Sequence, residues 1–263
     1  MMATIHQVSN FWDVQPCNSK DSFQGVGTRE YFDETEAQKY REEQHILPFA
    51  DFSQWKGKKV LEIGTGIGID AINFARAGAL YTGVDLSEKS LALCKERFNA
   101  YGLIGHFYCG NSEELSLFVP VESYDCIYSF GVIHHTPHPK RVFDELKKYC
   151  SPTTELRIML YAKWSWKVLR IILVQGKGAF WRRDELVRRN SEAQANCPVI
   201  YTYTFKEVRD LMKDFEILEI KKEYLSLWGT EKEFVYDLPL LIRRWLEHLL
   251  GWNILIVARR SDS

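Results

Sequence analysis

A glycine-rich turn at residues 64–68 constrains the fold of this chain more than any other segment. A short apolar run at residues 60–63 precedes it, and Gly64, Gly66 and Gly68 then alternate with other residues before an amphipathic stretch begins. Glycine adopts backbone dihedrals that a Cβ forbids, and it lets a ligand lie against bare main chain. The segment therefore predicts a strand, a tight ligand-binding turn and a helix that packs closely at Gly68.

The spacing and charge of this turn indicate which ligand it binds. Its pattern is G-x-G-x-G, whereas the dinucleotide-binding pattern is G-x-G-x-x-G. Glu62 places a carboxylate beside the turn, which disfavours a phosphate and favours a ligand with an ammonium group. A dinucleotide-dependent oxidoreductase is therefore the weaker alternative.

Strand-like and helix-like segments alternate regularly after residue 58. We expect strands near residues 59–64, 81–85, 104–109, 124–130, 154–162, 215–224 and 252–258, and helices near 67–77, 88–101 and 139–149. Short connections of this kind predict a doubly wound α/β fold, with a mostly parallel, seven-stranded sheet and helices on both faces.

Polar residues stand at the expected carboxyl ends of three of these strands. Asp85 ends the second strand, Asn111 and Ser112 follow the third, and His134 and His135 follow the fourth. Open α/β sheets bind ligands at this edge, where an acid can accept both hydroxyls of a ribose. The amide and the hydroxyl after the third strand are candidates for an adenine edge.

Four segments together resemble a known family. Residues 62–68, 84–87, 110–115 and 129–135 are similar to four consecutive motifs of class I S-adenosylmethionine-dependent methyltransferases, in particular the small-molecule, ubiquinone/menaquinone-biosynthesis-like group. The resemblance extends over residues 58–162. It implies a Rossmann-like methyltransferase fold, S-adenosyl-L-methionine as cofactor, and methyl transfer to a small-molecule acceptor by in-line substitution, with catalysis mainly through positioning. Whether the acceptor atom is O, N, S or C is left open.

The resemblance also implies cofactor contacts. Glu62 would contact the ammonium group, Asp85 the ribose, and Leu86 the adenine ring. The expected cofactor-binding residues are Glu62, Gly64, Thr65, Gly66, Gly68, Asp85, Leu86, Asn111, Ser112, Phe130 and Val132. The family often has an acid at the place of Asn111, where the amide of this chain could bind adenine or form a turn.

His134 and His135 are the candidates for catalysis. Either imidazole could deprotonate an acidic hydroxyl or thiol of the acceptor. The alternative is that the pair hydrogen-bonds the loop or the cofactor backbone.

Segments outside the alternating region are expected to complete the site. Residues 1–57, with a helix near 34–47, would form an N-terminal helical cover over the cofactor or the sheet edge. Residues 58–263 would form the cofactor-binding domain, with an inserted substrate lid at 163–204 after strand five and a second insertion at 227–251. The candidate acceptor-binding residues are Tyr31, Tyr40, Trp164, Trp181, Arg182 and Tyr201. The lid aromatics could equally form the core of the insertion.

Charge and cysteine content disfavour several other classes. A formal net charge of −1 gives no general case for nucleic acid binding. The six cysteines include no C-x-x-C pair, so no metal site is expected, and Cys94, Cys109 and Cys126 are expected to be reduced core residues. No secretory signal or membrane-spanning run is apparent, which predicts a cytoplasmic protein without integral membrane association. The sequence leaves a homodimer open.

Two further functions remain open. Cys17, Cys150 and Cys197 could gather to hold arsenite or another soft acceptor for methylation. A cofactor-binding partner or regulatory subunit without enzymatic activity is the other alternative, although intact glycine and acidic motifs argue against it.

Overall fold

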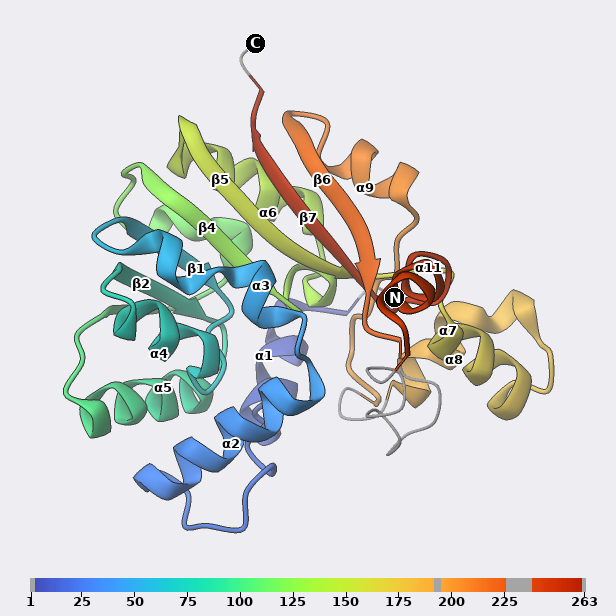
Figure 1. Ribbon diagram of the computed structural model, residues 1–263, viewed down its shortest axis with the longest axis horizontal. Helices are drawn as coiled ribbons and strands as arrows, with labels where there is room; N and C mark the ends of the chain where they lie inside the picture. The colour runs from blue at the N-terminus through green and yellow to red at the C-terminus, as the bar shows by residue number, and fades with distance from the viewer. Residues whose placement is uncertain (1–2, 192–194, 226–237, 262–263) are drawn as a thin grey trace.

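One mixed sheet organises the molecule. The computed structural model describes residues 3–191, 195–225 and 238–261, which contain a seven-stranded sheet in the order β3-β2-β1-β4-β5-β7-β6 (Figure 1). The strands are β1 (Lys59–Ile63), β2 (Leu80–Asp85), β3 (His106–Cys109), β4 (Tyr124–Phe130), β5 (Cys150–Tyr161), β6 (Phe215–Glu223) and β7 (Asn253–Arg260). Strands β1 to β5 run parallel, and β7 pairs antiparallel with both β5 and β6. The expected doubly wound fold is confirmed.

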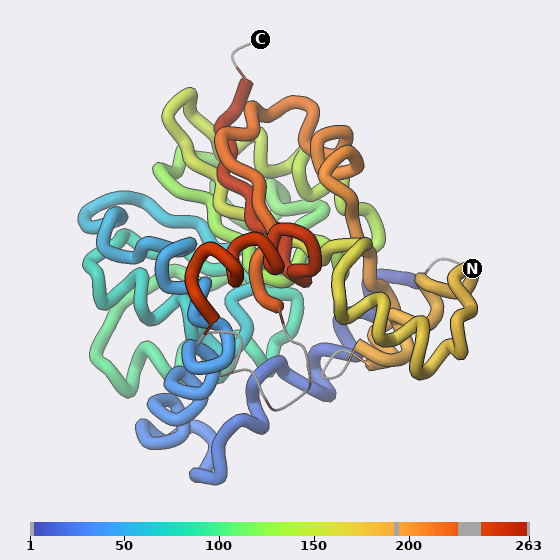
Figure 2. The backbone as a smooth tube through the Cα atoms, turned by 45° about the vertical axis from the view of Figure 1, so that its right-hand side comes forward, coloured from blue at the N-terminus to red at the C-terminus, as the bar shows by residue number. Residues whose placement is uncertain are grey.

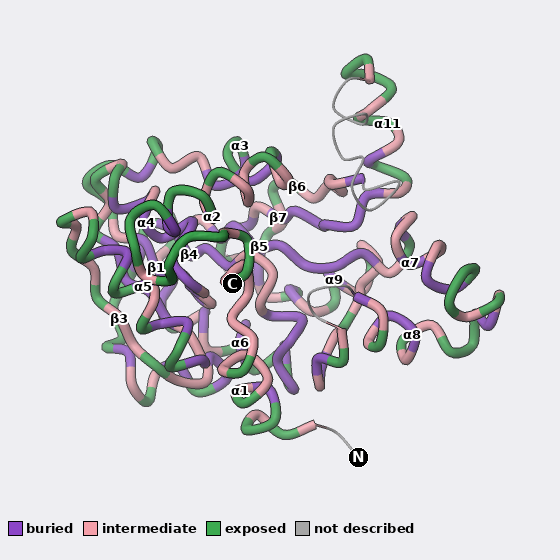
Figure 3. The backbone as a smooth tube through the Cα atoms, turned by 90° about the horizontal axis from the view of Figure 1, so that it is seen from below, coloured by how far each residue is buried: buried purple, intermediate pink, exposed green. Residues whose placement is uncertain are grey.

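Side chains alternate along the strands and build a separate core on each face of the sheet. Val60 packs with the helices of one face, while its neighbour Leu61 packs with those of the other. The helices are α1 (Ile5–Val14), α2 (Arg29–Glu42), α3 (Ile46–Ala50), α4 (Ile69–Arg76), α5 (Glu88–Tyr101), α6 (Pro139–Leu146), α7 (Trp166–Arg170), α8 (Arg183–Asn190), α9 (Phe205–Leu211) and α11 (Leu240–Leu250). Helices α3, α4, α5, α7 and α8 contribute to the first core, and α6 and α9 to the second. Figure 3 shows that buried backbone is concentrated in the central strands.

Strands β2 and β4 lie on opposite sides of β1, so the direction in which the chain winds across the sheet reverses at this point. Helix α4, which follows β1, joins one core, whereas α6, which follows β4, joins the other. The connections after β1 and β4 therefore leave the sheet in opposite directions. Doubly wound sheets bind their ligands in the crevice that this divergence opens.

The N-terminal helices differ from the single helix expected near 34–47. Helix α2 begins at Arg29 because the side chain of Thr28 accepts a hydrogen bond from the Tyr31 backbone N–H, which caps the helix. It ends at Glu42, and the short helix α3 follows. The chain therefore turns between two helices within the segment where one was predicted.

The segment expected to be a lid holds helices α7 and α8. Figures 1 and 2 place both helices to one side of the sheet, away from β1–β3. Val168 and Leu186 anchor them to the first core. Of the second expected insertion, residues 227–237 lie outside the described part and α11 occupies most of the rest. No described helix is both long enough and apolar enough to cross a bilayer.

Candidate functional site

A cavity of about 310 Å³ lies at the carboxyl ends of β1, β2 and β4. Its wall includes Glu62, Gly64, Thr65 and Gly66 from the first strand and turn, and Asp85 from the second strand. Other wall residues that the sequence predicts are Leu86, Asn111, Ser112, Phe130, Val132 and His135. The structure therefore brings together ten of the eleven expected cofactor-binding residues and one of the two histidines.

The glycine turn has no room for a side chain at Gly64, whereas the space beside Gly66 is open. Gly64 donates its N–H to the Val84 carbonyl at 2.7 Å and has a φ of +84°. A Cβ there would lie 2.1 Å from Cγ2 of Val132. At Gly66, with φ of +53°, a Cβ would meet nothing within 4 Å. Bare main chain at Gly66 therefore forms part of the cavity wall, as a ligand-binding turn requires.

Gly68 does not line the cavity, which corrects its expected cofactor contact. A Cβ at Gly68 would lie 2.7 Å from Sγ of Cys94 in α5. The residue allows close packing at the start of α4, but the close neighbour is a helix rather than the predicted strand.

Two buried carboxyl groups, those of Glu62 and Asp70, line the cavity. Glu62 accepts a hydrogen bond from the Tyr81 hydroxyl at 2.7 Å, and Asp70 accepts one from Tyr40 and one from Tyr128, each at 2.8 Å. Burial raises the pKa of both carboxyl groups, and the charge of Asp70 raises the pKa of Glu62 further. A cationic ligand group would relieve the cost of burying both charges.

Asp85 is held in place by main-chain donors. Its two carboxyl oxygens accept the N–H groups of Gly66 at 2.7 Å and Ser87 at 2.8 Å. Burial raises the pKa of Asp85 to about 6, although these hydrogen bonds oppose the shift. Each carboxylate oxygen keeps lone-pair capacity for a ligand hydroxyl.

Asn111 forms a turn and also lines the cavity. Its side-chain carbonyl accepts the N–H of Glu113 at 3.0 Å and begins the short helix Ser112–Leu117. The residue also lines the cavity, as does Ser112. Because the carbonyl oxygen serves the turn, the amide NH₂ is the group left for a ligand.

The two histidines differ in what they can do. His135 lines the cavity, and its Nδ1 lies 2.8 Å from the Val199 carbonyl. A carbonyl only accepts, so Nδ1 carries the proton and the unpartnered Nε2 carries a lone pair. Burial lowers the pKa of His135 to about 4. His134 is buried against the Tyr161 ring, with 3.8 Å between ring centroids, and does not line the cavity.

Comparison with known proteins finds similarity over the segment that holds the glycine turn and Asp85. Residues 60–153, from β1 into β5, match the model of a methyltransferase domain. Over this segment the chain is similar to a methyltransferase domain. The chain is 32% identical over 99 residues to the ubiquinone biosynthesis O-methyltransferase of Haemophilus ducreyi, covering 36% of this chain and 42% of that protein. It is 35% identical over 86 residues to the protein of the same name from Chromobacterium violaceum, covering 33% and 37%.

The chain thus spans less than half the length of these curated relatives. Solved structures extend the likeness in fold to the whole chain. The magnesium protoporphyrin IX methyltransferase of Synechocystis with bound SAH has a TM-score of 0.63 at 15% identity, covering 98% of this chain and all of that one. A [4+2]-cyclase has a TM-score of 0.60 at 14% identity, covering 100% and 98%. The two structures share the fold with this chain, and their activities differ.

The rest of the cavity wall comes largely from outside the matched residues 60–153. Its polar and aromatic side chains include Trp12, Lys39, Tyr161, Lys167, Tyr224, Trp252 and Asn253. The side-chain carbonyl of Asn253 is buried without a partner, and its amide lies 2.9 Å from Nε2 of His45. Because β7 runs antiparallel to β5, its first residues lie beside Tyr161 at the end of β5. None of these residues was predicted.

None of the six expected acceptor-binding residues lines the cavity. The Tyr31 hydroxyl donates a hydrogen bond to the Ser19 carbonyl, and the Tyr40 hydroxyl donates one to the carboxyl group of Asp70. Trp164 and Trp181 are 55% and 85% exposed. In this structure these side chains serve the fold or face solvent.

The other two members of that set lie at the surface of the lid segment. Arg182 forms an ion pair with Glu185 at 3.0 Å, and the Tyr201 hydroxyl donates to the Pro137 carbonyl at 3.3 Å. Of the described residues in 163–204, only Lys167 lines the cavity.

The three cysteines of the soft-acceptor hypothesis do not converge. Cys17 lines the cavity and Cys197 lies 3.5 Å from Nδ1 of His135, but Cys150 begins β5 at the opposite edge of the sheet. The described residues contain no cluster of His, Cys, Asp and Glu that could hold a metal ion. Cys94 and Cys126 are buried as expected, whereas Cys109 is exposed, which corrects its expected core position.

Proposed function

We propose that this protein binds S-adenosyl-L-methionine and transfers its methyl group to a small-molecule acceptor. The charge of the cavity wall carries the proposal. Its described acidic residues are Asp21, Glu42, Glu43, Glu62, Asp70 and Asp85, against the two lysines Lys39 and Lys167. An excess of carboxylates suits a cofactor with a sulfonium and an ammonium group, and it repels the pyrophosphate of a dinucleotide.

The residues present fit this cofactor at each end. Asp85 would accept hydrogen bonds from the ribose hydroxyls, and Leu86, Asn111 and Ser112 would surround the adenine. Glu62 and Asp70 would receive the ammonium group, with the bare main chain at residues 64–66 between the two ends. Open space at Gly66 and the two buried carboxyl groups, whose pKa values burial raises, support this placement.

The acceptor would bind against the aromatic part of the wall, where the rings of Tyr161 and Trp252 stack with 4.2 Å between centroids. The bound cofactor supplies an activated methyl group, so the protein must mainly align the acceptor and remove its proton. Nε2 of His135 would take that proton as the acceptor's lone pair replaces the bond between the methyl carbon and the cofactor sulfur, on which the electron pair of the broken bond would stay. Because the curated relatives are named O-methyltransferases, a hydroxyl is the first acceptor class to test.

A thermal-shift experiment tests cofactor binding directly. S-adenosylmethionine and S-adenosylhomocysteine should each raise the Tm of the full chain, and NADH should not. Asp85→Ala should abolish the shift. Asp125→Ala is the matched control, because Asp125 also accepts a backbone N–H, from Lys59, but at the opposite edge of the sheet. An unchanged shift in Asp85→Ala would refute the ribose contact.

An activity assay separates the enzyme from a regulatory cofactor-binding subunit. We expect formation of S-adenosylhomocysteine when the protein and S-adenosylmethionine are incubated with a panel of hydroxylated aromatic compounds. Tight cofactor binding without turnover on any hydroxyl, amine, thiol or carbon acceptor would favour the non-enzymatic alternative.

The wider organisation is also a proposal. We infer that residues 1–57 cover the cofactor, because Trp12, Cys17 and Lys39 line the cavity. All six cysteines are free, which fits a reducing cytoplasmic compartment. A homodimer and the absence of a nucleic-acid partner stay predictions from the sequence, which light scattering and a gel-shift assay would test.

A further inference from the structure

One part of the cavity wall combines a cation with two stacked aromatic rings. Nζ of Lys167 lies 5.0 Å from the centroid of the Trp252 ring, and this ring stacks on that of Tyr161 with 4.2 Å between centroids. All three residues line the cavity. The six acidic residues of the described wall lie on other segments, none of them on α7, β5 or β7. This part of the wall therefore suits a ligand group of negative charge.

Helix α7 fixes the position of the lysine. The side-chain hydroxyl of Ser165 accepts the N–H of Val168 at 3.3 Å and caps the helix. Val168 is buried in the first core. Because a cap and a buried neighbour hold the main chain on either side of it, Lys167 is held at the cavity, where it is half-buried.

Asn253 supplies a hydrogen-bond acceptor beside the two rings. It follows Trp252 and pairs in register with Tyr161 across β7 and β5. Its side chain is buried, its amide nitrogen lies 2.9 Å from Nε2 of His45, and its carbonyl oxygen has no partner among the described residues. Burial lowers the pKa of His45 to about 4, so the neutral ring can accept the amide N–H. The carbonyl is then left for an O–H or N–H donor of a ligand, since a buried carbonyl without a donor is costly.

The candidate base adjoins the same rings. The ring of His135 lies edge-on to that of Tyr161, with 5.7 Å between centroids. Contacts therefore run from the base through the two rings to Lys167. An acceptor that follows this part of the wall would place a hydroxyl at the base, an aromatic body against the rings and an anionic group at the lysine.

We propose that the acceptor is a hydroxylated aromatic acid, whose carboxylate binds Lys167 while one of its hydroxyls faces His135 and another donates to the Asn253 carbonyl. The residues that select the acceptor would then come from α7 and the start of β7, both outside the matched residues 60–153. This inference rests on the proposed function and deepens it by naming the class of substrate.

Initial rates at saturating S-adenosylmethionine test the assignment, with mono- and dihydroxybenzoates and the matching hydroxybenzamides as acceptors. For the wild-type protein, kcat/KM of the preferred acid should exceed that of its amide about 10- to 100-fold, the range of one charge-assisted hydrogen bond. Lys167→Gln should remove this preference, mainly by raising the KM of the acids, and Lys167→Arg should keep most of it. Lys163→Gln is the matched control and should keep the preference, because Lys163 lies in the same segment but forms an ion pair with Glu207 outside the cavity wall.

The carbonyl contact has a separate readout. Wild-type protein should prefer dihydroxybenzoates to monohydroxybenzoates, and Asn253→Ala should lose that preference while keeping the preference for acids over amides. Circular dichroism of each variant confirms that it is folded.

Three results would overturn the inference. They are equal kcat/KM for acids and amides in the wild-type protein, an unchanged preference for acids in Lys167→Gln, and turnover confined to acceptors without a carboxylate. Failure of the proposed function looks different, because the protein would then bind no S-adenosylmethionine or would methylate no acceptor of any charge.

Discussion

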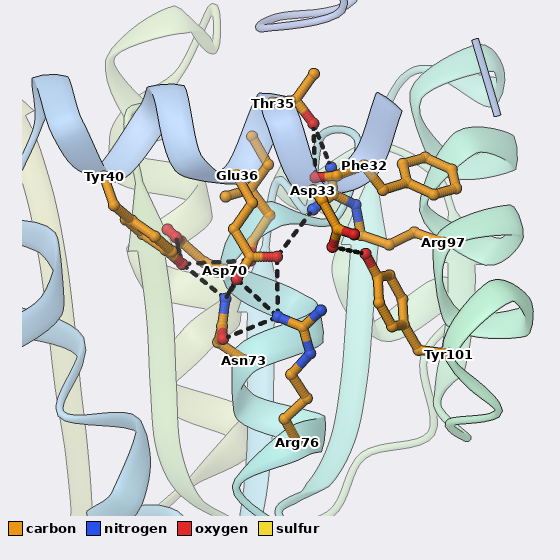
Figure 4. A network of polar contacts seen from close by, with 11 residues as sticks. Phe32, Asp33, Thr35, Glu36, Tyr40, Asp70, Asn73, Arg76, Arg97 and Tyr101 are labelled. Carbon is orange, nitrogen blue, oxygen red and sulfur yellow. Dashed lines mark hydrogen bonds and ion pairs between the residues drawn. The ribbon is translucent and has the colours of Figure 1, made fainter. Parts of the chain in front are cut away.

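Replacing Glu36 with Gln should destabilise the protein through a single buried charge. Arg97 in α5 has no exposed side-chain surface, and its NH1 lies 3.6 Å from Oε2 of Glu36 (Figure 4). Its remaining contacts are a hydrogen bond from NH2 to the Thr35 hydroxyl at 2.8 Å and the face of the Phe32 ring. The substituted amide would keep the shape of the side chain and an acceptor for Asn73 but remove the negative charge.

The size of the effect follows from burial. Breaking a buried ion pair by removing one partner costs about 3 to 5 kcal/mol, because the other charge stays in a poorly solvating site. The pair between Glu36 and Arg76 adds at most about 1 kcal/mol, since the arginine side chain is 33% exposed. We therefore expect a loss of about 3 kcal/mol in the free energy of unfolding, or roughly 6 to 12 °C in Tm.

Urea denaturation of a double-mutant cycle provides the measurement. Arg97→Met removes the buried charge and can pack on the Phe32 ring, so Glu36→Gln/Arg97→Met should recover most of the stability that Glu36→Gln loses. A loss under about 1 kcal/mol in Glu36→Gln would refute the reasoning. A double variant no more stable than Glu36→Gln would refute it as well, since the damage would not then come from the arginine charge.

Three further predictions concern the cavity. Gly64→Ala should lower the free energy of unfolding by about 3 kcal/mol, because the new Cβ would meet Val132 at 2.1 Å and the backbone has a positive φ. Gly66→Ala should cost only about 1 kcal/mol but abolish the cofactor thermal shift. Equal losses of stability in urea would contradict this. Cofactor affinity should fall as the pH drops through about 6, because Asp85, whose pKa burial raises to about 6, accepts the ribose hydroxyls fully only when ionised. Titration calorimetry of Asp85→Asn should show a flatter dependence of affinity on pH. An equally steep dependence would exclude Asp85 as its cause. His135→Gln should lower kcat by about 10² or more without changing the cofactor thermal shift. The wild-type rate should stay level above about pH 5, because burial lowers the pKa of His135 to about 4. Undiminished turnover in His135→Gln would exclude His135 as the general base.

The part of the cavity wall at the ends of β1, β2 and β4 could be predicted because its signals are local. Gly64, Gly66 and Asp85 act at strand ends, and strand ends can be read from apolar runs and turn residues. Asn111 and His135 follow the same rule. The parallel sheet then brings these ends to one edge without further information.

The remaining wall depends on contacts that no local pattern reveals. Tyr40 and Asp70 meet because α2 packs against α4, and nothing in the spacing of either residue indicates the other. Aromatic content alone did not predict which tryptophan lines the cavity: Trp181, which was predicted to, faces solvent, whereas Trp252, which was not, lines it. An available signal was missed: an antiparallel last strand begins, rather than ends, at the ligand-binding edge, which points to Trp252 and Asn253.

The shared core has a consequence for anyone who shortens this chain. The family match starts at residue 60, yet Ile46, Phe49 and Trp55 pack in the same core as Phe74 of α4. A fragment cut at the match would expose that apolar surface, leave the charge of Arg97 without Glu36, and open the cavity where α1 and α2 close it. The unit that buries this core and closes the cavity therefore reaches back beyond the matched segment, at least to α1.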